Sequence, residues 1–218
     1  MSPLERFLDP SKTSLKICGV TKLEEADQLI ELGVEAIGIN FWPKSKRYLA
    51  PEHANWLASL DPSTLRVGVF VNEDSKLALD LVKRGLIDVI QLHGDESPAD
   101  TKPYQDAGVP FIKAIGVKTI DDLQHAAEFN ANAILLDACA PGVYGGTGET
   151  FDWKTAIDFK DQHPNIPIIL AGGIVPDNAQ LATDTVQPAA LDVASGAELS
   201  PGIKDFNKVS ALIAATQR

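Results

Sequence analysis

Eight short apolar runs, rich in β-branched residues, recur along this chain with starts 21 to 33 residues apart. Each is followed by a longer stretch whose apolar residues are at helical spacing. We predict strands at 15–18, 36–41, 65–71, 89–92, 111–115, 133–137, 166–171 and 190–193. We predict helices at 23–32, 51–60, 75–85, 98–108, 120–129, 152–162, 176–183 and 205–216. Such alternation indicates an α/β protein with a parallel sheet.

The simplest closure of eight such units is a single (β/α)8 barrel, the TIM barrel. The chain has 218 residues, which fits one domain because α/β barrels commonly contain about 200–250 residues. We predict an N-terminal lead-in over residues 1–14 and a barrel domain over residues 15–218. An open doubly wound sheet is the alternative, and the lack of Gly-x-Gly-x-x-Gly after the first strand weakens it.

The charge of the chain argues against several classes of partner. A net charge of −11 and a pI of about 4.7 disfavour nucleic acid or an anionic membrane as the main partner. The first residues include acidic Glu5 and lack the apolar run of a secretory signal peptide. Two cysteines are too few for a disulfide framework. We expect a cytoplasmic protein, a monomer or a homodimer, with a small-molecule ligand.

In an α/β barrel the functional residues lie just after each strand. Cys18 ends the first predicted strand and Asp137 ends the sixth, so we select them as a candidate base and a candidate acid. Each has a simpler interpretation, since a single cysteine commonly packs as a small apolar residue and an aspartate commonly caps a loop.

Two Gly-containing turns follow the last two strands. Gly172-Gly173 and Ser195-Gly196 would let backbone N–H groups approach an anion, and this is the recurrent phosphate site of the barrel fold. Either pair alone could simply relieve crowding in a tight turn. Together they predict phosphate binding.

Further candidate substrate-binding residues follow the second and fourth strands. The guanidinium of Arg47 suits a carboxylate, although Arg47 also fits a solvated basic loop. Gln91 and His93 lie at the fourth strand end, where His93 could also be an ordinary turn residue. No His, Cys and Asp cluster has metal-ligand spacing, so we predict no metal site. The Gly-rich segment 141–148 is interpreted as a loop over the site or as a connector.

The chain resembles the phosphoribosylanthranilate isomerase family over about residues 15–210, with the matching segments in the same order. The matching segments are Lys16-Ile17-Cys18-Gly19-Val20-Thr21, Gly38-Ile39-Asn40-Phe41, Lys44-Ser45-Lys46-Arg47-Tyr48, Val67-Gly68-Val69-Phe70-Val71-Asn72, Gln91-Leu92-His93-Gly94-Asp95-Glu96, Leu135-Leu136-Asp137, Gly145-Gly146-Thr147-Gly148, Phe151-Asp152-Trp153, Leu170-Ala171-Gly172-Gly173-Ile174, Ser195-Gly196 with Glu198, and Pro201-Gly202-Ile203-Lys204-Asp205.

The resemblance implies an Amadori rearrangement in tryptophan biosynthesis, from N-(5'-phosphoribosyl)anthranilate to 1-(2-carboxyphenylamino)-1-deoxyribulose 5-phosphate, without metal or organic cofactor. It implies that Asp137 is the general acid, Cys18 the general base and Arg47 the ligand of the anthranilate carboxylate. The sequence departs from the family pattern at Ala194 and Ala197, where a Ser and a Val are more frequent, which removes one candidate hydroxyl contact to phosphate.

Two other functions stay open from the residues. Another phosphosugar barrel, such as an epimerase or indole-glycerol-phosphate synthase, would need metal-binding His and Asp residues or a catalytic Lys at a strand end, and neither is evident. A phospholigand-binding barrel without catalysis is disfavoured because both Cys18 and Asp137 are present.

Overall fold

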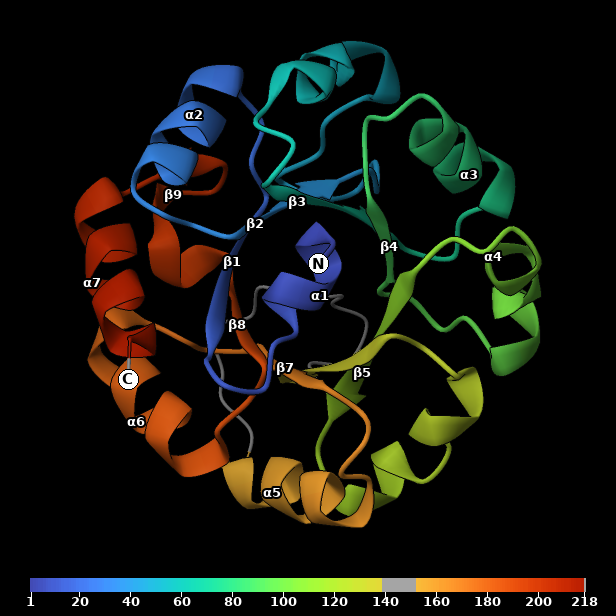
Figure 1. The fold of residues 1–218 in the computed structure, drawn as a ribbon, viewed down its shortest axis with the longest axis vertical. Helices are drawn as coiled ribbons and strands as arrows, with labels where there is room; N and C mark the ends of the chain where they lie inside the picture. Colours follow the sequence, from blue (N-terminus) through green and yellow to red (C-terminus); the bar gives the residue numbers. More distant parts are fainter. Residues whose placement is uncertain (139–151, 218) are drawn as a thin grey trace.

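The chain forms a closed barrel of eight parallel strands, seen end-on in Figure 1. This computed structural model describes residues 1–138 and 152–217. Each strand pairs with the next in the sequence, and β8 pairs with β1. This closure confirms the predicted barrel and excludes the open sheet. The strands are β1 (Ser14–Cys18), β2 (Ala36–Asn40), β3 (Leu65–Phe70), β4 (Val89–Leu92), β5 (Phe111–Val117), β6 (Ala133–Ala138), β7 (Ile168–Leu170) and β8 (Ala190–Val193).

Helices surround the barrel as an outer ring (Figure 1). The side chains of Asp74, Asp152 and Asp205 accept hydrogen bonds from backbone N–H groups at the starts of α3, α5 and α7, where such caps satisfy donors that lack a partner within the helix. The ring contains α2 (Leu23–Glu31), α3 (Ser75–Lys83), α4 (Lys102–Asp106), α5 (Trp153–Gln162), α6 (Pro176–Val186) and α7 (Phe206–Thr216).

Three predicted helices differ in the structure. The segment 51–60 forms two short 3₁₀ helices, η1 (Pro51–His53) and η2 (Asn55–Ser59), and 98–108 begins as η3 (Pro98–Thr101) before α4. The segment 120–129 forms η4 (Ile120–Leu123) and η5 (Ala126–Phe129). The Asp122 carboxylate accepts hydrogen bonds from the N–H groups of Lys118 and Thr119, and such side-chain bonds compete with regular α-helix.

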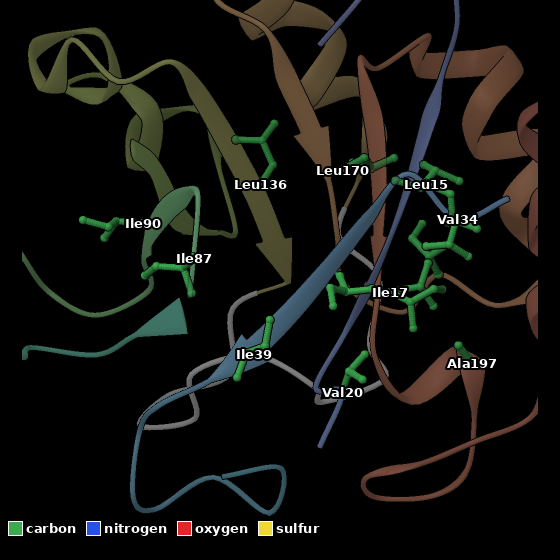
Figure 2. Close-up of a cluster of buried hydrophobic side chains, with 14 of the residues drawn as sticks. Leu15, Ile17, Val20, Val34, Ile39, Ile87, Ile90, Leu136, Leu170 and Ala197 are labelled. Atoms are coloured by element: carbon green, nitrogen blue, oxygen red, sulfur yellow. The ribbon is translucent and has the colours of Figure 1, made fainter. Parts of the chain in front are cut away.

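The period-2 alternation of the strands divides the core into two clusters. Leu15 and Ile17 of β1 point outward and join the larger cluster between barrel and helices, where Figure 2 shows them with Leu170 of β7. Residues of the other parity point into the barrel. On β1 these are Ser14, Lys16 and Cys18, so a lysine and a thiol share the interior face.

The N-terminal segment packs against the barrel. Helix α1 (Pro3–Phe7) lies over the centre of the barrel in Figure 1, and its Phe7 is buried in the interior cluster with Leu65 and Val67 of β3. Ser2 and Glu5 form a capping box at its start. Because Leu65 begins β3, α1 covers the barrel end opposite the carboxyl ends of the strands. Residues 1–14, predicted as a polar lead-in, therefore contain a helix with a buried aromatic side chain.

An antiparallel hairpin of β9 (Glu198–Ser200) and β10 (Ile203–Lys204) follows β8 and was not predicted. It brings Glu198 and Lys204, both buried, to the carboxyl end of the barrel. No helix among the described residues has the length and apolar character needed to span a membrane.

Candidate active site

A cavity of about 420 Å³ opens at the carboxyl ends of the strands. Its lining comes from β1, β2 and the loop that follows it, and the ends of β3, β4, β6, β7 and β8. Seven of the predicted site residues line this cavity: five with functional side chains and the two glycines of the turn after β7. They are Cys18, Arg47, His93, Asp137, Ser195, Gly172 and Gly173. Gln91 and Gly196 lie outside this lining. Gln91 is two residues before His93, and Gly196 directly follows Ser195.

Cys18 is the last residue of β1, and its side chain reaches the cavity while remaining partly buried. Gly19, directly after it, has φ +75°, in the left-handed region that favours glycine. A side chain at Gly19 would also collide with that of Arg47. Burial raises the pKa of the Cys18 thiol, and Lys16 opposes this effect. The strand end thus places a thiol at the cavity floor with a lysine beneath it.

Asp137 is linked to a histidine and a glutamine. His93 Nε2 lies 3.2 Å from Asp137 Oδ2, and Gln91 Nε2 lies 2.8 Å from His93 Nδ1. Gln91 is fully buried and faces no part of the cavity. Its contact is with His93, so the structure places Gln91 behind His93, where it orients the ring.

Arg47 is held by a buried carboxylate. Its Nε and Nη2 donate to Glu198 at 2.8 and 2.7 Å, and Lys204 Nζ donates to the same carboxylate at 2.8 Å. Hydrogen bonding to Glu198 raises the pKa of Arg47. Glu198 therefore occupies one edge of the guanidinium, and Nη1 has no hydrogen-bond partner among residues 1–138 and 152–217. Arg47 lines the cavity, and Nη1 is the guanidinium nitrogen that Glu198 leaves for a ligand.

The two Gly turns lie at the β7 and β8 end of the cavity. Gly172 and Gly173 have φ +77° and +62°, in the left-handed region, and an added side chain at Gly196 would collide with the Ile174 carbonyl oxygen. In the described part of the chain, the N–H groups of Gly173, Ser195 and Gly196 have no protein acceptor. Backbone donors left without partners in this way are suited to an anion.

The rim of the cavity is locally basic although the chain is acidic overall. Lys44, Lys46 and Arg47, all from the loop after β2, line the cavity. The Gly turns come from the segments after β7 and β8. A ligand with two separate anionic groups would match this distribution of donors.

Several residues at the site were not selected as candidates from the sequence. Asn40 and Asp192 line the cavity, and Lys16, Glu198 and Lys204 support it from below or behind. The one available signal was the alternation of β1 and β8, which places Lys16 and Asp192 inside the barrel. Within the described ranges no group of three His, Cys, Asp or Glu is arranged to hold a metal ion. The predicted Gly-rich loop 141–148 lies outside the described residues.

Comparison with known proteins gives consistent matches along the chain. The family model described as N-(5'-phosphoribosyl)anthranilate (PRA) isomerase matches residues 15–215. The N-(5'-phosphoribosyl)anthranilate isomerase of Citrifermentans bemidjiense is 43% identical over 211 residues, covering 94% of this chain and 98% of that protein. The protein of the same name from Thermotoga petrophila is 40% identical over 200 residues, covering 91% and 96%.

Solved structures agree with these matches. The crystal structure of phosphoribosyl anthranilate isomerase from Thermotoga maritima has a TM-score of 0.85 at 38% identity and covers 94% of this chain and 98% of that one. A second structure has a TM-score of 0.82 at 36% identity, with the same coverage. It shows the isomerase in complex with reduced 1-(o-carboxyphenylamino)-1-deoxyribulose 5-phosphate.

Proposed function

The chain belongs to the N-(5'-phosphoribosyl)anthranilate isomerase family and is an isomerase of tryptophan biosynthesis, and we propose that Cys18 and Asp137 are its general base and general acid. The reaction is the Amadori rearrangement of an aminoaldose phosphate to an aminoketose phosphate. The observation that carries the proposal is that a thiol from β1 and a carboxyl group from β6 line the same cavity.

The chemistry needs one proton donor and one proton acceptor. Asp137 gives a proton to the ribose ring oxygen, the bond between that oxygen and C1 breaks, and the nitrogen lone pair forms a cationic Schiff base. Cys18, as thiolate, then takes the proton from C2, and the electron pair moves to give an enolamine. Proton transfer from the C2 hydroxyl to C1 converts the enolamine to the ketone. Acid and base act on different atoms of one sugar, which requires two fixed groups with different proton affinities.

The donors around the cavity suit the two ends of this substrate. The N–H groups of Gly173, Ser195 and Gly196 would bind the phosphate, with the left-handed Gly172 shaping the turn. Arg47, supported by Glu198, would bind the anthranilate carboxylate through its remaining edge. His93 would contact the substrate beside Asp137, and Gln91 would orient His93. The relative solved with a reduced phosphorylated product supports a phosphorylated small molecule as the ligand.

Turnover of the aminoaldose tests the function directly. Purified protein should convert N-(5'-phosphoribosyl)anthranilate, and the fluorescence of this substrate should decrease in an assay coupled to the next enzyme. No metal is added, and a chelator is present. A protein that binds the reduced product but gives no turnover would be a phospholigand-binding barrel, and the proposal would fail.

Replacing Arg47 by Ala should weaken binding of the reduced product by about 10- to 150-fold, or roughly 1.5–3 kcal/mol, as for a lost hydrogen bond to a charged group. The measurement is calorimetric titration with the reduced product and with ribose 5-phosphate, which lacks the carboxylate. Affinity for ribose 5-phosphate should stay almost constant.

Lys46→Ala is the matched control, since Lys46 is a cation of the same loop and also lines the cavity. It should cost much less affinity, because a single exposed charge contributes little. An equal loss of both ligands in Arg47→Ala would make Arg47 a structural or phosphate-binding residue and contradict its assignment.

A bulky residue at Gly196 should raise KM at least about tenfold, because its side chain would displace the backbone donors from the phosphate. Steady-state kinetics of Gly196→Val checks this, with Gly108→Ala as the control for backbone strain away from the site, since Gly108 has φ +64° and an added Cβ there meets nothing within 4 Å. In the unmodified protein, inorganic phosphate or sulfate should compete with the substrate. Absence of competition at tens of millimolar, the order of weak anion affinities, would count against the phosphate site.

The assembly and location of the chain remain predictions. A dimeric phosphoribosylanthranilate isomerase from Thermotoga maritima, from which monomers were generated, is 35% identical to this chain, with a TM-score of 0.82. The expectation of a monomer or a homodimer is compatible with that relative. The cytoplasmic location is proposed on the family's biosynthetic reaction.

A further inference from the structure

A lysine and an aspartate form an ion pair inside the barrel, at the floor of the cavity, which the aspartate lines. Lys16 Nζ lies 2.9 Å from both carboxylate oxygens of Asp192, and the two side chains are 0% and 6% exposed. The pairing of β1 with β8 sets Lys16 opposite Asp192 in register. Two buried charges gain little net stability from such a pair, because removing both from water costs nearly as much as their attraction returns. Stability alone therefore does not explain the pair.

The same lysine approaches the thiol of Cys18. The two residues are separated by one position on β1, so both side chains point into the barrel. Gly38 of β2 lies opposite Cys18 in register. A Cβ added at Gly38 would lie 2.7 Å from Cys18 Sγ and 2.9 Å from Lys16 Nζ. The missing side chain of Gly38 thus gives the space in which the thiol and the ammonium group come together.

Four charged groups from different elements act on the Cys18 thiol. Burial raises its pKa, Lys16 and Lys204 lower it, and Asp192 raises it. Arg47 also interacts electrostatically with Cys18. Lys16 has the largest effect among these charges. Although burial alone would lower the pKa of Lys16, Asp192 keeps that lysine protonated.

We propose that Lys16 is a positioning residue that stabilises the thiolate form of Cys18, and that Asp192 is the counter-charge of Lys16 while Cys18 is a neutral thiol. The inference rests on the proposed role of Cys18 as the base. Lys16 does not line the cavity, so it acts through Cys18. When the thiol loses its proton to solvent, Lys16 stays an ammonium group and faces the thiolate.

The opposite charges of the pair predict opposite effects on one measured quantity. In a Cys139→Ser background Cys18 is the one remaining thiol, and its alkylation by iodoacetamide is followed against pH. Lys16→Met should move the midpoint of this profile upward by about one pH unit or more, because a neighbouring opposite charge is lost. Asp192→Asn should move the midpoint downward, because the thiolate becomes the remaining counter-charge of Lys16.

Two further variants separate the electrostatic effect from loss of packing. Lys16→Arg keeps the charge and should leave the midpoint near that of the unmodified protein. Lys113→Met removes another buried, ion-paired lysine, which lies on the outer face of β5, and should leave the Cys18 profile unchanged. If Lys16→Met does not fold, Gly38→Ala gives an equivalent test, because its Cβ would separate sulfur from ammonium and raise the midpoint.

The outcome is decided by the direction of the two shifts. Midpoints that are unchanged, or that move the same way in the Lys16 and Asp192 variants, would overturn the inference. This readout needs no turnover, so it stays distinct from the proposed function. If the alkylation midpoint shifts as expected but the pH dependence of kcat does not follow it, the inference about Lys16 stands and the assignment of Cys18 as base fails.

Discussion

Replacing Cys18 by Ser is expected to lower kcat at least about a hundredfold, the usual scale for loss of a general base, while KM changes little. A serine hydroxyl has nearly the same size but cannot be ionised at neutral pH, so the C2 proton would have no acceptor. In the unmodified enzyme the thiolate is the active form, and burial raises the pKa of the thiol. Activity should therefore increase as pH rises through that pKa, and this dependence should vanish in Cys18→Ser.

Binding of the reduced product separates chemistry from folding in this experiment. Calorimetric titration should give Cys18→Ser an affinity within a few-fold of the unmodified protein, because sulfur and hydroxyl occupy similar space. Cys139→Ser, which changes the other cysteine of the chain, is the matched control and should keep normal turnover. A nearly normal kcat in Cys18→Ser would remove Cys18 from the mechanism.

The barrel could be predicted from the sequence because its strands are local and periodic. Strands buried on both sides need apolar residues at nearly every position, as in β2, where Ala36 lies in the interior cluster and Ile37 and Ile39 lie in the outer cluster. Regular spacing of such runs then leaves few ways to close the sheet. The ends of the strands follow from the same pattern, and so the positions of Cys18 and Asp137 at the site were accessible from the sequence.

The N-terminal helix could not be predicted from local sequence signals alone. Ser2, Pro3 and Glu5 form a recognisable helix start, with a capping box and proline at its first position. The helix has five residues, too few to be stable alone in water. Its stability depends on the burial of Phe7 against the strands. Nothing in the local sequence of residues 1–14 identifies that packing surface.

The contacts that orient the candidate site join residues far apart in the chain. Arg47 and Glu198 are 151 residues apart, and Lys16 and Asp192 are 176 residues apart. Charge and periodicity place each residue on an element but do not say which carboxylate meets which cation. Barrel closure decides this, because it brings β8 and the hairpin after it beside β1. The pairs Arg47–Glu198 and Lys16–Asp192 therefore could not be identified from the sequence.

Replacing Asp137 by Asn is expected to lower kcat by about 10²- to 10⁴-fold, because the amide cannot donate a proton to the ring oxygen in the way a carboxylic acid does. The change is nearly isosteric, and the amide can still make a hydrogen bond to His93. Ring opening should become the slowest step. Single-turnover measurements with the aminoaldose should show loss of substrate fluorescence slowed by the same factor as kcat.

His93→Gln provides the control that distinguishes the acid from its neighbour. His93 Nε2 contacts the Asp137 carboxylate at 3.2 Å, so a relay through His93 would make this variant as slow as Asp137→Asn. With Asp137 as the proton donor itself, His93→Gln should lose much less activity, and both variants should bind the reduced product. Gln91 Nε2 lies 2.8 Å from His93 Nδ1, so we expect the histidine to be held beside the acid and the substrate and not to be the proton donor. Equal losses in the two variants would transfer the acid role from Asp137 alone to the Asp137–His93 pair.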